Sequence, residues 1–200
     1  MKVLVIYESM SGNTAAMGEE VAASLRSHGL EVDSGPLSGF ELPGIAEVDL
    51  LVVGAPTHAH RMSSKATRKA AAEDERNPSP ERAAGPGMRE WLNGLPMGSG
   101  RLAASFDTRF DKPRAFTGSA AKGIAKRLER HGYHLIAEPE SFFVTGDHRL
   151  EDGQTDRATR WGATLAQRAS TAPLVDRRTF GRARPRAWMG SPAEPVGANW

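Results

Sequence analysis

The chain has 200 residues, of which 39% are hydrophobic and 25% are charged, and its formal net charge is +2. This length and apolar content suit one domain with a full core and leave little for a second. The sequence contains no cysteine, which excludes disulfides, iron–sulfur clusters and thiol redox chemistry. Any electrons that move through this protein must therefore be carried by an organic cofactor.

The positive charge is unevenly distributed along the chain. Residues 1–60 are acidic, whereas residues 171–200 hold five arginines and four prolines without a regular hydrophobic period. This composition predicts a basic tail at 171–200 behind a single domain at 1–170. Because the positive excess lies in a tail, we expect no nucleic-acid partner. Trp188 and Trp200 in the tail suggest docking on the body or on the second subunit of a homodimer, and a floppy C-terminus is the alternative.

The N-terminal residues lead directly into an apolar strand pattern. No apolar run approaches the ~20 residues that are needed to span a bilayer, and no segment resembles an export signal. We therefore expect a cytoplasmic protein without a membrane span.

The first half of the chain alternates strand and helix patterns. Residues 2–7 are almost continuously apolar, which is typical of a central parallel strand covered on both faces. Apolar residues that recur every four positions predict a helix from about 13 to 28. A short strand at 30–33 and a second buried strand at 49–54 follow. Residues 55–62 are then expected to form a loop at a strand end, where open α/β sheets bind ligands.

The second half continues the alternation. A helix at 65–75 capped by Ser63 or Ser64 is predicted first, followed by a surface excursion at 76–87 and a short helix at 88–93. A strand at 101–106 and a loop at 107–113 come next, and then a Thr117-capped helix that ends at Gly132. The last predicted elements are a strand within 133–144, interrupted by Pro139, and a helix at 155–169. Alternating strands and helices imply a parallel sheet with right-handed crossovers. The chain is therefore predicted to be an α/β protein.

Residues 9–14, between the first strand and the first helix, have the composition of a phosphate cradle. A helix start offers unpaired N–H groups and the positive end of the macrodipole, and the hydroxyls of Ser9, Ser11 and Thr14 can donate to phosphate oxygens. The segment has no Lys, unlike the nucleoside-triphosphate loop, and Gly12 lacks the partner glycine of the dinucleotide fold. The alternative is an ordinary helix cap that binds nothing.

The cradle also carries a family resemblance. The pattern Ser/Thr-x-Ser/Thr-Gly-x-Thr after a first strand is met by Ser9, Ser11, Gly12 and Thr14, and with it the chain resembles the flavodoxin family over about residues 1–168. The resemblance implies an open three-layer α/β/α sandwich whose five-stranded parallel sheet has the order 2-1-3-4-5. It also implies flavin mononucleotide (FMN) at the switch point, where the flavin performs the redox chemistry.

Carried over position by position, the resemblance implies three groups of cofactor-binding residues. The phosphate would contact Ser9, Met10, Ser11, Gly12, Asn13 and Thr14, and the flavin ring would lie between Pro56, Thr57, His58, Ala59 and His60 on one side and Asp107, Thr108, Arg109 and Phe110 on the other. No residue is assigned a catalytic role. Electron-carrier flavodoxins are acidic around the flavin, whereas Arg61, Arg109 and Lys112 are basic, so we expect a flavin that accepts its second electron more easily.

Three functions remain open at this point. The protein is an electron carrier with a redox partner protein, or a small FMN-dependent oxidoreductase of the NAD(P)H:quinone type with a small-molecule electron acceptor, or a binding module that has lost FMN. A metal pair at His58 and His60 has no third ligand nearby, and a hydrolase site of Ser11 and His58 lacks a Gly-x-Ser-x-Gly elbow. Both are therefore weaker hypotheses.

Overall fold

The computed structural model describes residues 1–58, 61–73, 87–113 and 117–172. Its strands are β1 (Lys2–Tyr7), β2 (Glu31–Pro36), β3 (Leu50–His58), β4 (Arg61–Met62), β5 (Leu102–Phe110), β6 (His134–Leu135) and β7 (Glu140–Val144). Its helices are α1 (Asn13–Ser27), α2 (Lys65–Glu73), α4 (Met88–Asn93), α6 (Ala120–Arg130) and α7 (Gln154–Thr171). Two 3-10 turns, Leu37–Gly39 and Leu42–Glu47, lie between β2 and β3.

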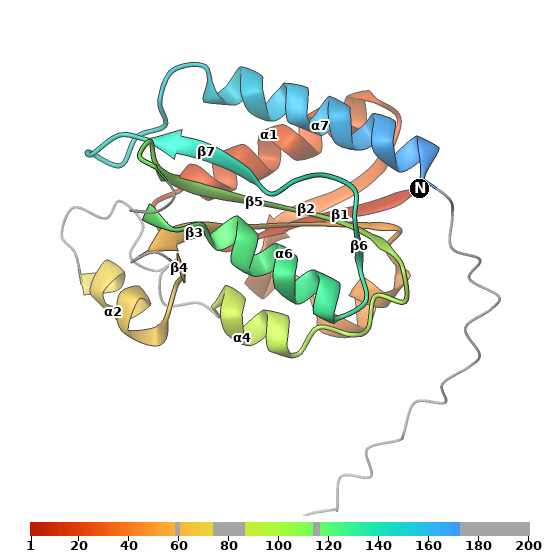
Figure 1. The fold of residues 1–200 in the computed structure, drawn as a ribbon, viewed down its shortest axis with the longest axis horizontal. Coiled ribbons are helices and arrows are strands. Elements are labelled where there is room, and N and C mark those ends of the chain that lie inside the picture. The colour runs from red at the N-terminus through yellow and green to blue at the C-terminus, as the bar shows by residue number, and fades with distance from the viewer. Residues whose placement is uncertain (59–60, 74–86, 114–116, 173–200) are drawn as a thin grey trace, which may run out of the picture.

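A parallel sheet with the strand order β2-β1-β3-β5-β6 forms the middle layer (Figure 1). Its last position is shared by two short strands, because β6 pairs with the start of β5 at Leu102 and β7 pairs with its end from Phe106 onward. The two short strands flank Pro139, where a break was predicted. When β6 and β7 are counted together as the fifth strand, the predicted five-stranded sheet in the order 2-1-3-4-5 is confirmed.

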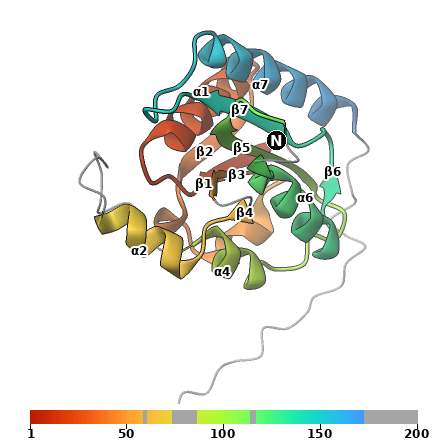
Figure 2. The same ribbon diagram turned by 60° about the vertical axis from the view of Figure 1, so that its left-hand side comes forward.

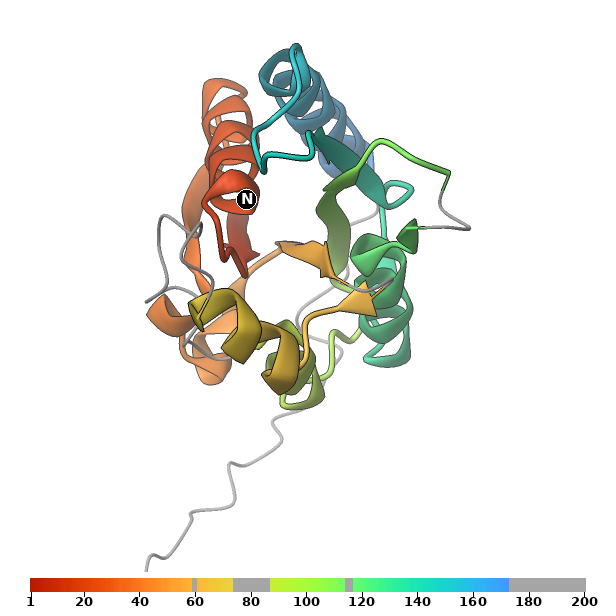
Figure 3. The same ribbon diagram turned by 90° about the vertical axis from the view of Figure 1, so that its left-hand side faces the viewer.

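Helices cover both faces of this sheet. Figure 3 shows α1 and α7 on one face and α4 and α6 on the other, so the predicted three layers are confirmed. The core under α1 and α7 centres on Phe106, Phe142 and Trp161, whose rings meet edge to face with centroids 5.9 to 6.1 Å apart. The opposite core contains Trp91 and Leu92 of α4.

Two strands are longer than predicted. The segment 55–62 was expected to be a loop, but β3 runs on to His58 and pairs antiparallel with β4, with Thr57 opposite Met62. The segment 107–113 was also expected to be a loop, but β5 continues to Phe110 because β7 pairs with it there. Both predictions were wrong for the same reason. The polar residues of these segments form strands because a neighbouring strand pairs with them.

The N-cap of α6 also differs from the prediction. The predicted cap was Thr117, whereas Ser119 caps the helix by accepting a hydrogen bond of 3.2 Å from the amide of Lys122. The predicted cap of α2 is confirmed at Ser64, whose hydroxyl accepts from the amide of Thr67. Helix α2 lies next to α4 at one end of the sheet (Figure 2).

Several predictions fall outside the part of the chain that the structure describes. Most of the excursion at 76–87 and nearly all of the tail at 171–200 belong to this group. Among the described helices, none is long and apolar enough to cross a membrane.

Candidate functional site

The carboxyl ends of β1, β3 and β5 lie at the same edge of the sheet, next to the N-terminus of α1 (Figure 1). The three predicted groups of site residues therefore come together, apart from Ala59 and His60, which lie outside the described residues. The buried members are Ser9, Met10, Thr14, Pro56, Asp107, Thr108 and Arg109; the half-buried members are Ser11, Gly12, Asn13, Thr57 and His58; Phe110 is exposed.

The cradle is shaped by its backbone. Gly12 is the N-cap of α1 and has φ +91°, a left-handed conformation that residues with a side chain rarely adopt. The hydroxyl of Ser9 accepts a hydrogen bond of 3.2 Å from the amide of Ala15, which satisfies one donor of the first turn. Within the described chain, the amides of Asn13 and Thr14 have no hydrogen-bond partner. These two donors point to an anion site at the start of the helix.

Side chains join the cradle to distant parts of the chain. The hydroxyls of Thr14 and Thr108 are 2.7 Å apart, so the first turn of α1 is hydrogen-bonded to the end of β5. The side-chain amide of Asn13 donates to the backbone carbonyl of His148 at 2.7 Å. The hydroxyl of Ser11 makes no hydrogen bond within residues that the structure describes, and it is therefore available to a ligand.

Asp107 organises the ends of β3 and β5 from inside the protein. Its side chain is fully buried, and its Oδ2 accepts hydrogen bonds from the hydroxyls of Thr57 at 3.0 Å and Ser119 at 2.7 Å and from the amide of Ala121 at 2.9 Å. The Thr57 hydroxyl in turn accepts from the amide of Ala120 at 2.8 Å. The side chains of Asp107 and Thr57 thus fix the start of α6 against both strands.

Arg109 holds the chain that follows β5. Its Nη1 donates to the carbonyls of Phe110 and Lys112, at 3.1 and 2.7 Å, and to the hydroxyl of Thr117 at 3.1 Å. Its guanidinium carbon lies 4.9 Å from the centroid of the Phe143 ring, within cation–π range. The charge of Arg109 is therefore engaged within the protein.

The flat side chains of Phe110, His148 and His58 lie near one another beside the cradle. The Phe110 ring is 40% exposed, and its centroid is 6.1 Å from that of His148, with the planes tilted by 49°. Burial lowers the pKa of His58, and the charge of His148 lowers it further, so His58 is neutral at neutral pH. His148 is not among the predicted site residues. Because His148 follows the last strand of the sheet, its place in the sequence could have indicated that it lies at this edge.

Comparisons with known proteins agree with this architecture. No family model and no curated protein matches the chain. Among solved structures, a flavodoxin from the domain Archaea matches with 21% identity and a TM-score of 0.61, covering 85% of this chain and 99% of that one. The chain has the flavodoxin-like fold. Flavodoxin 1 from Bacillus cereus matches with 20% identity and a TM-score of 0.60, over 84% of this chain and 98% of that one.

The flavodoxin-like fold also occurs within a larger structural neighbour. The rubredoxin oxygen:oxidoreductase from Desulfovibrio gigas matches with 16% identity and a TM-score of 0.55. The match covers 84% of this chain but only 36% of that one. At these identities the likeness concerns the fold.

A buried acid in this flavodoxin-like chain lies directly before the cradle. Glu8 is 5% exposed, its Oε2 accepts from the amide of Met88 at 2.9 Å, and its Oε1 accepts from the hydroxyl of Ser63. Burial raises the pKa of Glu8, although both hydrogen bonds and nearby Arg68 partly oppose this. Since Ser63 precedes α2 and Met88 begins α4, one carboxyl joins both helices to the end of β1.

The hydrolase hypothesis gains no support from the geometry, and the metal pair is not tested, because His60 lies outside the described residues. Ser11 and His58 make no hydrogen bond with each other, so a nucleophile and its base are not paired. Across residues 1–58, 61–73, 87–113 and 117–172, no group of three or more His, Asp or Glu is placed to hold a metal ion.

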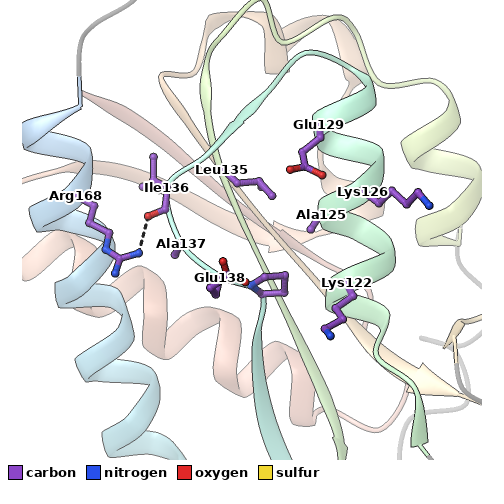
Figure 4. Close-up of a pocket in the computed structure, with 10 residues that line it drawn as sticks. Lys122, Ala125, Lys126, Glu129, Leu135, Ile136, Ala137, Glu138 and Arg168 are labelled. Carbon is purple, nitrogen blue, oxygen red and sulfur yellow. Dashed lines mark hydrogen bonds between the residues drawn. The ribbon is translucent and has the colours of Figure 1, made fainter. Parts of the chain in front are cut away.

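A concave site lies between α6 and α7, over the break in the fifth strand (Figure 4). It is a groove of about 780 Å³. Its lining residues are Lys122, Ala125, Lys126, Glu129, Leu135, Ile136, Ala137, Glu138, Pro139 and Arg168. Arg168 donates from Nη1 to the carbonyl of Ile136 at 2.9 Å. No predicted site residue lines this groove.

Proposed function

We propose that this protein binds FMN at the carboxyl edge of its sheet and serves as an electron carrier. The single observation that carries the proposal is the cradle, in which a left-handed Gly12 leaves the amides of Asn13 and Thr14 without internal partners. When bound, FMN supplies one- and two-electron redox chemistry, and the protein supplies position and electrostatics.

The residues of the cradle fit a phosphate monoester. The first-turn amides of α1 and the positive end of its macrodipole favour an anion, and the Ser11 hydroxyl adds a neutral donor. Thr14 is already hydrogen-bonded to Thr108, so its hydroxyl holds the cradle against β5 and its amide is the donor for the ligand. A dianionic phosphate would thus be bound mainly by oriented dipoles.

The residues beside the cradle fit a flat, largely apolar ring. Phe110 and the neutral His58 offer faces for contact, and each follows by two residues the register pair of Pro56 and Thr108 in the paired strands β3 and β5. Because Phe110 is 40% exposed, a ring packed against it would keep an edge open to a protein partner. That openness favours a carrier over an oxidoreductase with an enclosed substrate pocket.

Binding is tested by titrating the cofactor-free protein with FMN and following the quenching of flavin fluorescence. Ser11→Ala is expected to weaken FMN binding about tenfold, because a hydrogen bond to a charged group contributes about 1.5 to 3 kcal/mol. Riboflavin, which lacks the phosphate, should bind equally to both proteins. Ser27→Ala, at an exposed position at the opposite end of α1 from the cradle, is the matched control. If calorimetry detects no heat when FMN is added, the proposal is refuted. The remaining hypothesis is then a binding module that has lost FMN.

The carrier is distinguished from the enzyme by anaerobic reduction of the FMN-loaded protein. NADH or NADPH is added as the reductant without any other protein, first alone and then together with each of a panel of quinones as the electron acceptor. A carrier is expected to be reduced only when a reductase is present. Rapid direct turnover would replace the carrier with an oxidoreductase of the NAD(P)H:quinone type.

A further inference from the structure

The exposed side of helix α6 is almost uniformly positive. Four of its 11 residues are basic, whereas only Glu129 is acidic. At 3.6 residues per turn, the basic side chains cover one continuous arc of about 140° around the helix. They are Lys122, Lys126, Arg127 and Arg130. Glu129 lies at one border of this arc, beside the groove between α6 and α7 (Figure 4).

Arg89 extends the positive surface onto α4, which lies beside α6 on the same face of the sheet (Figure 1). Nη2 of Arg89 donates to the carbonyl of Met62 at 3.0 Å. Nη1 of Arg127 donates to the carbonyl of Gly123 at 3.1 Å. Burial lowers the pKa of Arg127, and the charges of Arg89 and Arg130 lower it further, so the three cations lie close together.

No carboxylate of the described residues forms a salt bridge with these cations. The acid next to Arg89 in the chain, Glu90, is paired with Arg68 at 3.4 Å. The guanidiniums of Arg89 and Arg127 contact neutral carbonyls, which do not cancel their charge. The name basic face is used below for the five residues of this surface, Arg89, Lys122, Lys126, Arg127 and Arg130.

The basic face adjoins the candidate site. Met62, whose carbonyl accepts from Arg89, is the register partner of Thr57 at the end of β3. The hydroxyl of Thr57 also accepts from the amide of Ala120, the first residue of α6. The basic face therefore begins at the carboxyl edge of the sheet and continues along α6.

We propose that the basic face binds an acidic protein and that this protein is the redox partner of the carrier. The inference rests on the proposed function in giving the partner a redox role. Guanidinium and ammonium groups without ion pairs attract the carboxylates of an acidic surface and steer it toward the edge of the site. At the β2 edge of the sheet, the exposed acids Glu19, Glu31 and Asp33 outnumber Arg26 and repel the same partner. The two edges together would orient its approach.

An acidic protein fits this face better than a nucleic acid does. Surfaces that bind single strands combine a positive groove with aromatic rings on which the bases stack. The only aromatic residue of α4 and α6 is Trp91, which is buried. The basic face thus offers charge without stacking, and carboxylates satisfy such a surface.

The proposal is tested with two polyanions of similar length and charge, a poly-glutamate peptide and an oligothymidylate. Each is titrated into the full-length, cofactor-free protein at low salt. Binding is followed by NMR at the amides of α4 and α6, because the arginines of residues 171–200 also attract anions. The peptide is expected to shift these amides and to bind more weakly as salt is added.

The decisive variant is Arg127→Gln/Arg130→Gln, which removes two charges and keeps good helix formers. The dissociation constant for the peptide, measured at the α6 amides, is expected to rise about fivefold. Arg149→Gln/Arg160→Gln, at exposed positions outside the basic face, is the matched control and should leave it unchanged. Lys122→Gln/Lys126→Gln should have the same effect as the decisive variant and replaces it if that variant does not fold.

Three results would overturn the proposal. The first is an equal loss of peptide affinity in the control and in both basic-face variants. The second is tighter binding of the oligothymidylate than of the peptide at the α6 amides, which would make the face a nucleic-acid surface. The third is salt-sensitive self-association without added peptide, detected by light scattering and abolished by the decisive variant, which would make the occupant a second copy of this chain.

The FMN titration described above separates this inference from the proposed function. If FMN does not bind but the peptide binds as expected, the proposed function and the redox role of the partner fall, and the acidic-protein surface stands. If FMN binds and the basic-face variants bind the peptide like the wild type, the proposed function stands and the assignment of the basic face falls.

Discussion

The cradle and the strand ends beside it are built in different ways. The cradle takes its shape from consecutive residues, through the left-handed Gly12, the bond between Ser9 and Ala15, and the start of α1. The ends of β3 and β5 are held by residues far apart in the chain, which converge on the carboxylate of Asp107. A site built from consecutive residues is recognisable in a sequence. A site built from residues that come together from distant positions depends on a few buried contacts, so a single substitution can disrupt it.

Removal of the Asp107 carboxylate should have the largest effect on this comparison. Asp107→Ala leaves the hydroxyls of Thr57 and Ser119 and the amide of Ala121 without their shared acceptor. We expect the free energy of unfolding, measured in urea, to fall by about 3 kcal/mol. Asp111→Ala, at an exposed position nearby, should change it by less than about 0.5 kcal/mol. Equal effects would show that Asp107 does not organise the strand ends.

The cradle should be most sensitive at its glycine. Gly12→Ala forces a side chain into a left-handed conformation, which costs about 1 to 2 kcal/mol. Gly29 follows α1 with φ +79° and open space around it, so Gly29→Ala carries a similar backbone cost away from the site. Both variants should be less stable in urea, but only Gly12→Ala should bind FMN more weakly. Loss of affinity in both would refute a local role for the cradle glycine.

Glu8 connects the cradle to α2 and α4 and should make stability depend on pH. Its pKa in the folded protein is raised above 4.5 by burial, so the protonated form favours folding. This contribution is complete below pH 4.5 and is lost as the pH rises through the folded pKa. Compared with Glu8→Gln, the wild-type protein should thus lose about 1.4 kcal/mol for each unit by which the pKa is raised.

Urea unfolding of both proteins between pH 4 and pH 8 measures this difference. Glu31→Gln, at an exposed position on β2, is the control for removing a carboxylate. If the wild type and Glu8→Gln differ by the same amount at every pH, the raised pKa of Glu8 is wrong.

The smallest effect is expected where the two regions meet. The hydroxyls of Thr14 and Thr108 link α1 to β5, and a double-mutant cycle with Thr14→Val and Thr108→Val isolates their interaction. We expect a coupling energy of about 1 kcal/mol in urea unfolding, because each single variant leaves one buried hydroxyl without its partner. A coupling energy of zero would mean that the two regions are held together by other contacts.

The fold was predictable because its main patterns are local. The apolar run at 2–7 and the short helix at 88–93 were predicted with the boundaries that the structure has. The ends of β3 and β5 were predicted too early, because Thr57 and Asp107 are polar and their strand structure comes from pairing with β4 and β7. Local propensity does not contain that information.

The candidate site was predictable only in part, for a similar reason. Its cofactor-binding residues stay a prediction, although the described ones lie at one edge of the sheet. The contacts that connect them, Thr14 with Thr108 and Asn13 with His148, join residues separated by 94 and 135 positions. No spacing rule relates such residues, and His148 was missed because a histidine in a turn has no periodic pattern around it.

The groove between α6 and α7 has a consequence for how the sheet meets other molecules. At this border the outer strand of the sheet is β6, which is only two residues long and ends before Pro139. The carbonyl of Ile136, just after β6, already accepts a hydrogen bond from the guanidinium of Arg168. An incoming strand needs an uninterrupted row of free amides and carbonyls. This border therefore resists strand addition by another polypeptide, and with it the edge-to-edge growth that leads to aggregation.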